Sequence, residues 1–164
     1  MADDASFDAF YRQSRQRLYD CLYALTGDPA EAQDAAQEAF ARAWQRWPTV
    51  GGYDDPEAWV RTVGRRIAVS RWRRTRNRLT AQRRLGPPDP VPPPSAATTM
   101  MISALARLPV EQRTAIVLHH LCDRSVAEVA AETGVPVGTV KARLSRGRHA
   151  LAALLRIEPE DSHV

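Results

Sequence analysis

The 164-residue sequence has no hydrophobic run long enough to cross a bilayer, and it has only two cysteines. A membrane-spanning helix needs about 20 consecutive apolar residues, and the acidic start MADDASFDAF lacks the basic and apolar regions of a signal peptide. Cys21 and Cys122 lie far apart without metal-ligand spacing, so we expect free thiols and no disulfide. We therefore expect a cytoplasmic protein without membrane insertion, bound metal or cofactor.

The sequence also lacks the residue patterns that mark an enzyme. It shows no nucleophile with a base partner, no phosphate-binding loop and no pair of carboxylates in a plausible site. His119, His120 and Cys122 could be interpreted as a metal cluster. Adjacent histidines point to different sides of a helix, however, and no second cluster completes a tetrahedral site. We therefore predict that the protein is not an enzyme and that these residues take part in ordinary helix packing.

Acidic residues are missing from one long segment of the chain. Arg61–Arg84 holds ten arginines and no acid, whereas residues 1–60 hold eleven acids and five arginines. The net charge of +4 hides this segregation. So many like charges repel one another unless an anion compensates them, although a solvated basic helix remains the alternative. The pattern predicts an acidic surface followed by a basic band suited to phosphates.

A strand pattern is missing from the first half, which has the periodicity of helices. Apolar residues recur at helical spacing over residues 6–26. A second helix is predicted over residues 29–47, because Asp28 is placed as an N-cap before a proline and Glu31 follows three residues later. A third helix is predicted after Asp55, which also precedes a proline, and it continues into the arginine-rich segment.

A proline-rich segment separates the two halves. Six prolines occur in LGPPDPVPPPSAATT, residues 85–99, and such a density favours a semi-rigid extended linker. We therefore predict an all-α protein of two small helical domains joined by a Pro-rich linker. The predicted boundaries are a first domain at 1–78, a linker at 79–99, a second domain at 100–156 and a tail at 157–164.

The second half carries a helix-turn-helix pattern. Short helices are predicted over residues 100–107 and 109–121. In SVAEVAAETGVPVGTVKARL, Ser125 and Glu128 form a capping box, and Gly134 supplies the positive φ of a sharp turn. The acid-free helix that follows would expose a DNA-facing set of side chains, with a solvated packing helix as the alternative. This set comprises Thr139, Lys141, Arg143, Arg146 and Arg148.

Four segments resemble one known family. They are LTGDPAEAQDAAQEAFARAWQRW, DDPEAWVRTVGRRIAVSRWRR, ALARLPVEQRTAIVLHHL and SVAEVAAETGVPVGTVKARLSRGRHAL. Together they are similar to regions 2 and 4 of the extracytoplasmic-function (ECF, group 4) sigma factors of RNA polymerase. The resemblance is greatest to the compact actinobacterial, SigE-like members. It implies that the first domain is region 2, the second is region 4, and the protein directs transcription initiation at promoters.

The resemblance also implies partners and site residues. The partners would be core RNA polymerase, through its large-subunit clamp helices and flap, and double- and single-stranded promoter DNA; an anti-sigma factor is a further partner that the family allows. The polymerase-binding residues would be Asp34, Gln37, Glu38 and Arg42. Contacts to the minus-ten element would come from Tyr53, Arg61, Arg65, Arg66, Trp72, Arg73 and Arg74. Contacts to the minus-thirty-five element would come from Ser125, Thr139, Lys141, Arg143, Ser145, Arg146 and Arg148.

Departures from the family pattern limit what can be carried over. Many members have Asn where this chain has Arg66 and Asp where it has Ser70, so the minus-ten preference does not transfer. Trp59 is expected in the core, whereas Trp72 fits a core or a base-stacking role equally well. The alternative function is a helix-turn-helix transcriptional regulator that acts without binding the polymerase core. Such a regulator would need a receiver or ligand-binding domain, which the helical first half does not resemble.

Overall fold

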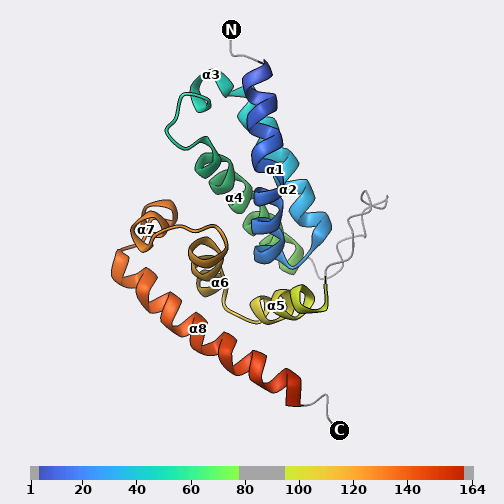
Figure 1. The fold of residues 1–164 in the computed structure, drawn as a ribbon, viewed down its shortest axis with the longest axis vertical. Coiled ribbons are helices and arrows are strands. Elements are labelled where there is room, and N and C mark those ends of the chain that lie inside the picture. The colour runs from blue at the N-terminus through green and yellow to red at the C-terminus, as the bar shows by residue number, and fades with distance from the viewer. Residues whose placement is uncertain (1–3, 78–94, 161–164) are drawn as a thin grey trace. The chain divides into compact units, whose positions relative to one another are not determined.

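The computed structural model describes residues 4–77 and 95–160. Within these residues every regular element is a helix, which confirms the predicted all-α class. The chain divides into two compact units, Met1–Pro92 and Pro93–Val164 (Figure 1). No helix in the described ranges is long and apolar enough to span a membrane.

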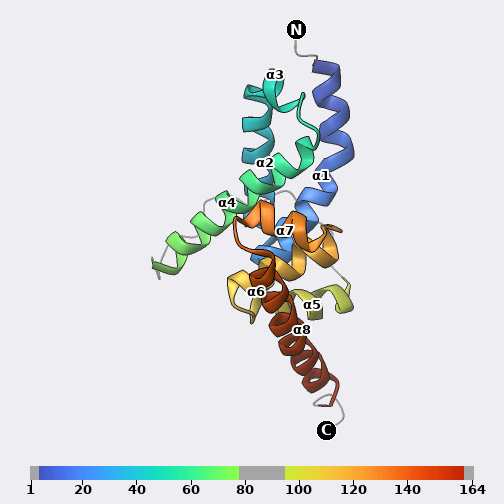
Figure 2. The ribbon, with the colours of Figure 1, turned by 90° about the vertical axis from the view of Figure 1, so that its left-hand side faces the viewer.

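The described part of the first unit, residues 4–77, contains three long helices and one short one. These are α1 (Asp4–Thr26), α2 (Pro29–Gln45), α3 (Trp47–Val50) and α4 (Pro56–Asn77). Each long helix packs against the other two, and α4 runs obliquely across α1 and α2 (Figure 2). Leucines of α1 and alanines of α2 form most of the core, which α4 completes with Val60 and Ala68.

Aspartate caps begin two of these helices, as predicted. Oδ1 of Asp28 accepts hydrogen bonds from two backbone N–H groups of the first turn of α2, at 2.9 and 3.3 Å. Oδ1 of Asp55 accepts from Ala58 N at 3.0 Å at the start of α4. The Glu31 side chain does not accept from the Asp28 N–H, as it would in a capping box, because that N–H donates to Thr26 Oγ1 at 3.2 Å. One side chain is therefore sufficient to cap α2.

The second unit consists of α5 (Ala96–Ala106), α6 (Val110–Ile116), the π-helical turn η1 (Val117–Leu121), α7 (Val126–Thr133) and α8 (Val137–Glu160). The long helix α8 packs against α5, α6 and α7. The most deeply buried side chains of this unit include Leu118, Val129, Val140 and Leu144.

Several predicted helix boundaries differ from those in the structure. The second helix ends at Gln45, because the chain bends at Arg46 and Pro48 then lies in the first turn of α3. Helix α5 begins four residues before the predicted start, because Ser95 Oγ caps it by accepting from Thr98 N at 3.2 Å. The helix predicted over residues 109–121 widens after Ile116 into η1.

The predicted linker and tail fall partly outside the described residues. Residues 79–94 of the linker and 161–164 of the tail belong to this undescribed part. Residues 96–99, which were predicted as linker, are helical in α5, and residues 157–160, which were predicted as tail, continue α8.

Candidate nucleic-acid and protein interfaces

Helix α2 has two chemically distinct faces. Its buried face consists of Phe40 and the alanines at positions 32, 35, 36, 39 and 43, none of which is more than 8% exposed. The four predicted polymerase-binding residues lie on the other side: Gln37 and Arg42 are exposed, and Asp34 and Glu38 are half-buried. Glu38 Oε1 accepts from Arg42 Nε at 3.2 Å, one turn apart on the surface. An exposed pair of this kind contributes only about 0.3–0.5 kcal/mol to folding, so it is not what holds α2 in place.

The loop after α3 presents Tyr53 to solvent. Trp47 and Val50 anchor α3 in the core with 5% and 1% of their surface exposed, whereas Tyr53 is 46% exposed. The backbone at Gly51 lies against the Trp47 ring, because a Cβ at position 51 would be 2.9 Å from that ring. The Tyr53 N–H donates to the Val50 carbonyl at 3.1 Å. The loop is therefore folded back on α3, with its aromatic side chain outward.

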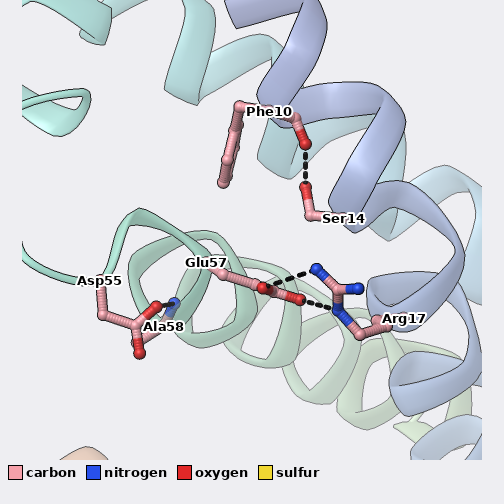
Figure 3. Close-up of polar contacts among 6 residues, drawn as sticks. All are labelled: Phe10, Ser14, Arg17, Asp55, Glu57 and Ala58. Atoms are coloured by element: carbon pink, nitrogen blue, oxygen red, sulfur yellow. Dashed lines mark hydrogen bonds and ion pairs between the residues drawn. The ribbon is translucent and has the colours of Figure 1, made fainter.

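An ion pair joins the start of α4 to α1 (Figure 3). Arg17 Nε donates to Glu57 Oε1 at 2.6 Å, and Arg17 Nη2 donates to Glu57 Oε2 at 3.1 Å. The hydrogen bond that Arg17 donates to Glu57, followed by the negative charge of Glu57, raises the pKa of Arg17. One turn earlier on α1, the buried Ser14 satisfies its hydroxyl by donating to the Phe10 carbonyl at 2.6 Å. Sequence spacing did not reveal the Arg17–Glu57 pair, because its members are 40 residues apart.

The arginines of α4 differ in how far they are exposed to solvent. Arg66 is exposed and Arg65 is half-buried, as is Trp59. Arg61, in contrast, is buried with 7% of its surface exposed, so its side chain is not presented at the surface of this helix. It falls on the helical stripe shared with buried positions 64 and 68, which packs toward the core. The side chains of Trp72, Arg73 and Arg74, in the last turns of α4, lie outside the described residues.

The helix-turn-helix motif forms as predicted. Ser125 N donates to Glu128 Oε1 and Glu128 N donates to Ser125 Oγ, both at 3.1 Å, so the capping box is present. Gly134 has φ 71° at the turn between α7 and α8. Val140 and Leu144 hold α8 against the core with 1% and 2% exposed. The motif is thus a rigid frame for whatever the outer face of α8 contacts.

Six of the seven predicted minus-thirty-five residues lie on α8. Lys141, Ser145, Arg146 and Arg148 are exposed, and Thr139 and Arg143 are half-buried. The seventh, Ser125, uses its hydroxyl to cap α7. The outer face of α8 therefore combines cations with small polar groups, as a helix that enters a major groove requires.

Two histidines of η1 make separate polar contacts. His119 Nδ1 lies 2.7 Å from the Arg124 carbonyl oxygen, and His120 Nε2 accepts from Arg148 Nε at 3.1 Å. Burial, and then the charges of His119 and Arg148, lower the pKa of His120. Within the described ranges, no group of three or more His, Cys, Asp or Glu side chains is arranged to hold a metal. The two histidines therefore have different partners, the backbone after η1 for His119 and a side chain of α8 for His120.

A buried arginine in α6 was not singled out by sequence. Arg113 is 6% exposed. Its Nε donates to the Leu105 carbonyl at 2.9 Å, and its Nη2 donates to the carbonyls of Ala106 and Leu108 at 3.2 and 3.0 Å. A cation at these carbonyls satisfies the C-terminal end of α5 and complements its dipole. Burial lowers the pKa of Arg113.

Comparisons with known proteins cover both units. The chain matches the family models Sigma-70 region 2 over residues 10–78 and Sigma-70, region 4 over residues 99–151. It is 33% identical over 162 residues to the ECF RNA polymerase sigma factor SigL of Mycobacterium tuberculosis, across 94% of this chain and 92% of that one. It is 31% identical over 162 residues to the RNA polymerase sigma-E factor of Streptomyces coelicolor, across 98% and 88%. Among solved structures, the sigma factor RpoE of Bartonella quintana, crystallised with the anti-sigma factor NepR, aligns with TM-score 0.76 and 26% identity over 92% of this chain and 97% of that one.

Proposed function

The chain belongs to the ECF group of the sigma-70 family, and from this premise we propose how its two units divide the work of a sigma factor. The protein binds core RNA polymerase and promoter DNA and directs transcription initiation. Its relatives are sigma factors, which are transcription regulators; RNA synthesis itself is assigned to the polymerase. A helix-turn-helix regulator without polymerase binding is not favoured, because the first unit matches a sigma region as well.

The proposed division follows the two units. Residues 1–78 would act as region 2, which binds polymerase and recognises and melts the minus-ten element. Residues 100–156 would act as region 4, which reads the minus-thirty-five element, with a linker at 79–99 and a tail at 157–164. Support comes from the matched ranges, 10–78 and 99–151, and from the separate compact units.

The observation that carries the docking proposal is the two-faced character of α2. Its alanine face is committed to the core, so Asp34, Gln37, Glu38 and Arg42 can bind the clamp helices without disturbing the fold. Charges on an exposed helix face add little to stability but set partner choice and association rate. The flap of the polymerase is the proposed contact of the second unit.

DNA contacts are proposed for both units. Tyr53 would stack on a flipped base of the minus-ten strand, with Arg65 and Arg66 on phosphates, as single-stranded sites combine aromatic platforms with cations. Trp72, Arg73 and Arg74 continue the same helix and keep the role that the resemblance implies. On α8, Lys141, Arg143, Ser145 and Arg146 would face base edges, while Ser125, Thr139 and Arg148 would face the backbone.

Finer assignments rest on the named relatives. The 31% identity to the Streptomyces sigma-E factor, over 98% of this chain, supports an actinobacterial SigE-like type. The Bartonella RpoE was solved with an anti-sigma factor, which supports a similar partner here. The proposed location is the cytoplasm, where the polymerase works.

A charge reversal separates docking from folding. We expect the double variant Asp34→Lys and Glu38→Lys to lose association with core polymerase in a pull-down, because both substitutions place cations on the docking face. The matched control reverses two exposed acids of α1, Asp8→Lys and Asp20→Lys, and should bind as the parent does. Circular dichroism should show the parental helix content in both variants, because none of the four acids lies in the buried core and charges at the surface contribute only a few tenths of a kcal/mol. Parental binding by the α2 variant would exclude α2 as the docking surface.

A further inference from the structure

We propose that Arg17 and Glu57 form a positioning pair, which holds the loop carrying Tyr53 in the geometry needed for promoter opening. Neither residue belongs to the surfaces assigned above to polymerase or DNA. The inference rests on the proposed function, because the position of the loop matters only if Tyr53 contacts the melted strand.

The geometry of the pair favours positioning. Two guanidinium nitrogens, Nε and Nη2, each donate to a different carboxylate oxygen of Glu57, at 2.6 and 3.1 Å (Figure 3). Two parallel charge-assisted bonds fix the relative orientation of their helices as well as the distance between them. Arg17 lies midway along α1, whereas Glu57 lies in the first turn of α4, only four residues after Tyr53. The pair thus ties the exit of the loop to α1.

The opposite end of the loop is already fixed. Trp47 and Val50 are buried, the Gly51 N–H donates to the Trp47 carbonyl at 2.8 Å, and the Tyr53 N–H donates to the Val50 carbonyl at 3.1 Å. A loop held at both ends presents its exposed side chain in one place and loses little freedom on binding. Without the pair, the first turn of α4 would keep its Asp55 cap but lose this ion pair to α1.

A purely stabilising role explains the pair less well. The side chains of Arg17 and Glu57 are 64% and 29% exposed, and ion pairs this open to solvent add little to folding. Helix α4 is held by its packing against both α1 and α2 and is capped by Asp55. What the pair adds is orientation at the point where the loop enters the helix.

The test measures promoter opening with the full chain and core polymerase. Promoter duplexes are first selected from a random-sequence library by the parental holoenzyme. Opening is then followed by the fluorescence of 2-aminopurine placed in the start region, on duplex DNA and on the same DNA with a pre-melted bubble. The variants are Arg17→Gln, Glu57→Gln and both together. The control is Asp20→Asn, which removes an exposed charge of α1 whose hydrogen bond to Gln16 stays within the helix.

We expect each single variant to open duplex promoters roughly threefold to tenfold more slowly, the range that loss of one or two hydrogen bonds gives. The double variant should be no slower than either single variant, since both remove the same contact. The deficit should shrink on the pre-melted DNA, and core binding and the control should remain parental. The positioning role would be refuted if Glu57→Gln opened promoters at the parental rate or if the losses added up in the double variant. It would equally be refuted by an equal loss on pre-melted DNA or by an equally slow control. Failure of the parental holoenzyme to select or open any promoter would instead refute the proposed function, and the pair would fall with it.

Discussion

Replacing Arg113 by Ala should destabilise the second unit and leave the first unit unchanged. The guanidinium is 6% exposed and donates to three carbonyls near the end of α5. Truncation would remove all three of these bonds, although the Leu105 carbonyl would still accept from the Leu108 N–H at 3.1 Å. The variant would also lose the cation that complements the C-terminal end of the helix.

The magnitude follows from these contacts. A hydrogen bond to a charged group contributes about 1.5–3 kcal/mol when measured by mutation, and bonds that share one donor group are not additive. Burial opposes the charged form, as the lowered pKa of Arg113 indicates, so the net loss is smaller than the sum. We expect a loss of about 2–4 kcal/mol. For a unit of this size, that loss lowers the unfolding midpoint by roughly 8–30 °C.

The two units can be observed separately, because all four tryptophans lie in the first unit. Tryptophan fluorescence therefore reports the first unit, whereas far-UV circular dichroism reports both. In Arg113→Ala, part of the dichroism signal should melt early while the fluorescence transition keeps its parental midpoint. The control is Arg107→Ala, at the exposed C-terminal cap position of α5. An unchanged dichroism curve, or a fluorescence midpoint that falls equally, would refute the reasoning.

Three further predictions concern the second unit. Gly147→Ala should lower the free energy of unfolding by about 1–3 kcal/mol in a thermal melt, because the new Cβ would lie 2.9 Å from Ile116 Cγ1. The control Gly138→Ala meets no atom within 4 Å and should be neutral or up to about 1 kcal/mol stabilising. The lowered pKa of His120 means that folding favours its neutral form. The stability contribution of His120 should therefore be fully present above pH 6.5 and be lost as the pH falls through the folded pKa. Denaturation of His120→Gln across this range should show a weaker pH dependence than that of the parent. Arg146→Ala should weaken upstream promoter binding by about 1–3 kcal/mol if the side chain makes a bidentate base contact, and an unchanged footprint would exclude that contact.

Local signals predicted the helix starts that depend on neighbouring residues. Asp28, Asp55 and the Ser125–Glu128 box act within one turn of themselves, so their spacing in the sequence is also their spacing in the fold. The start of α5 was predicted too late, because Ser95 stands at the edge of the proline-rich segment and was interpreted as part of the linker. The density of prolines indicated a linker, although a single serine is sufficient to cap a helix that begins directly after them.

Features that depend on packing between helices escaped prediction. The burial of Arg61 follows from which stripe of α4 meets the core, and a run of arginines hides that stripe in the sequence. The Arg17–Glu57 pair and the role of Arg113 likewise require knowing which turns of separate helices face one another. Amphipathic spacing predicted which faces of α2 and α8 turn away from the core, whereas the roles proposed for residues on those faces come from the family resemblance.

The alanine face of α2 has a consequence for how this protein can change over time. Alanine has no side-chain rotamers, and four of the five alanines are fully buried at 0% exposure. Larger side chains at such buried positions force neighbouring groups to move, which costs typically about 1–3 kcal/mol, so we expect these positions to vary little. The outer face of the same helix has no such restriction and can vary in step with the polymerase surface that it meets. Affinity for the enzyme can therefore drift, or be tuned, on a helix whose contribution to the fold stays the same.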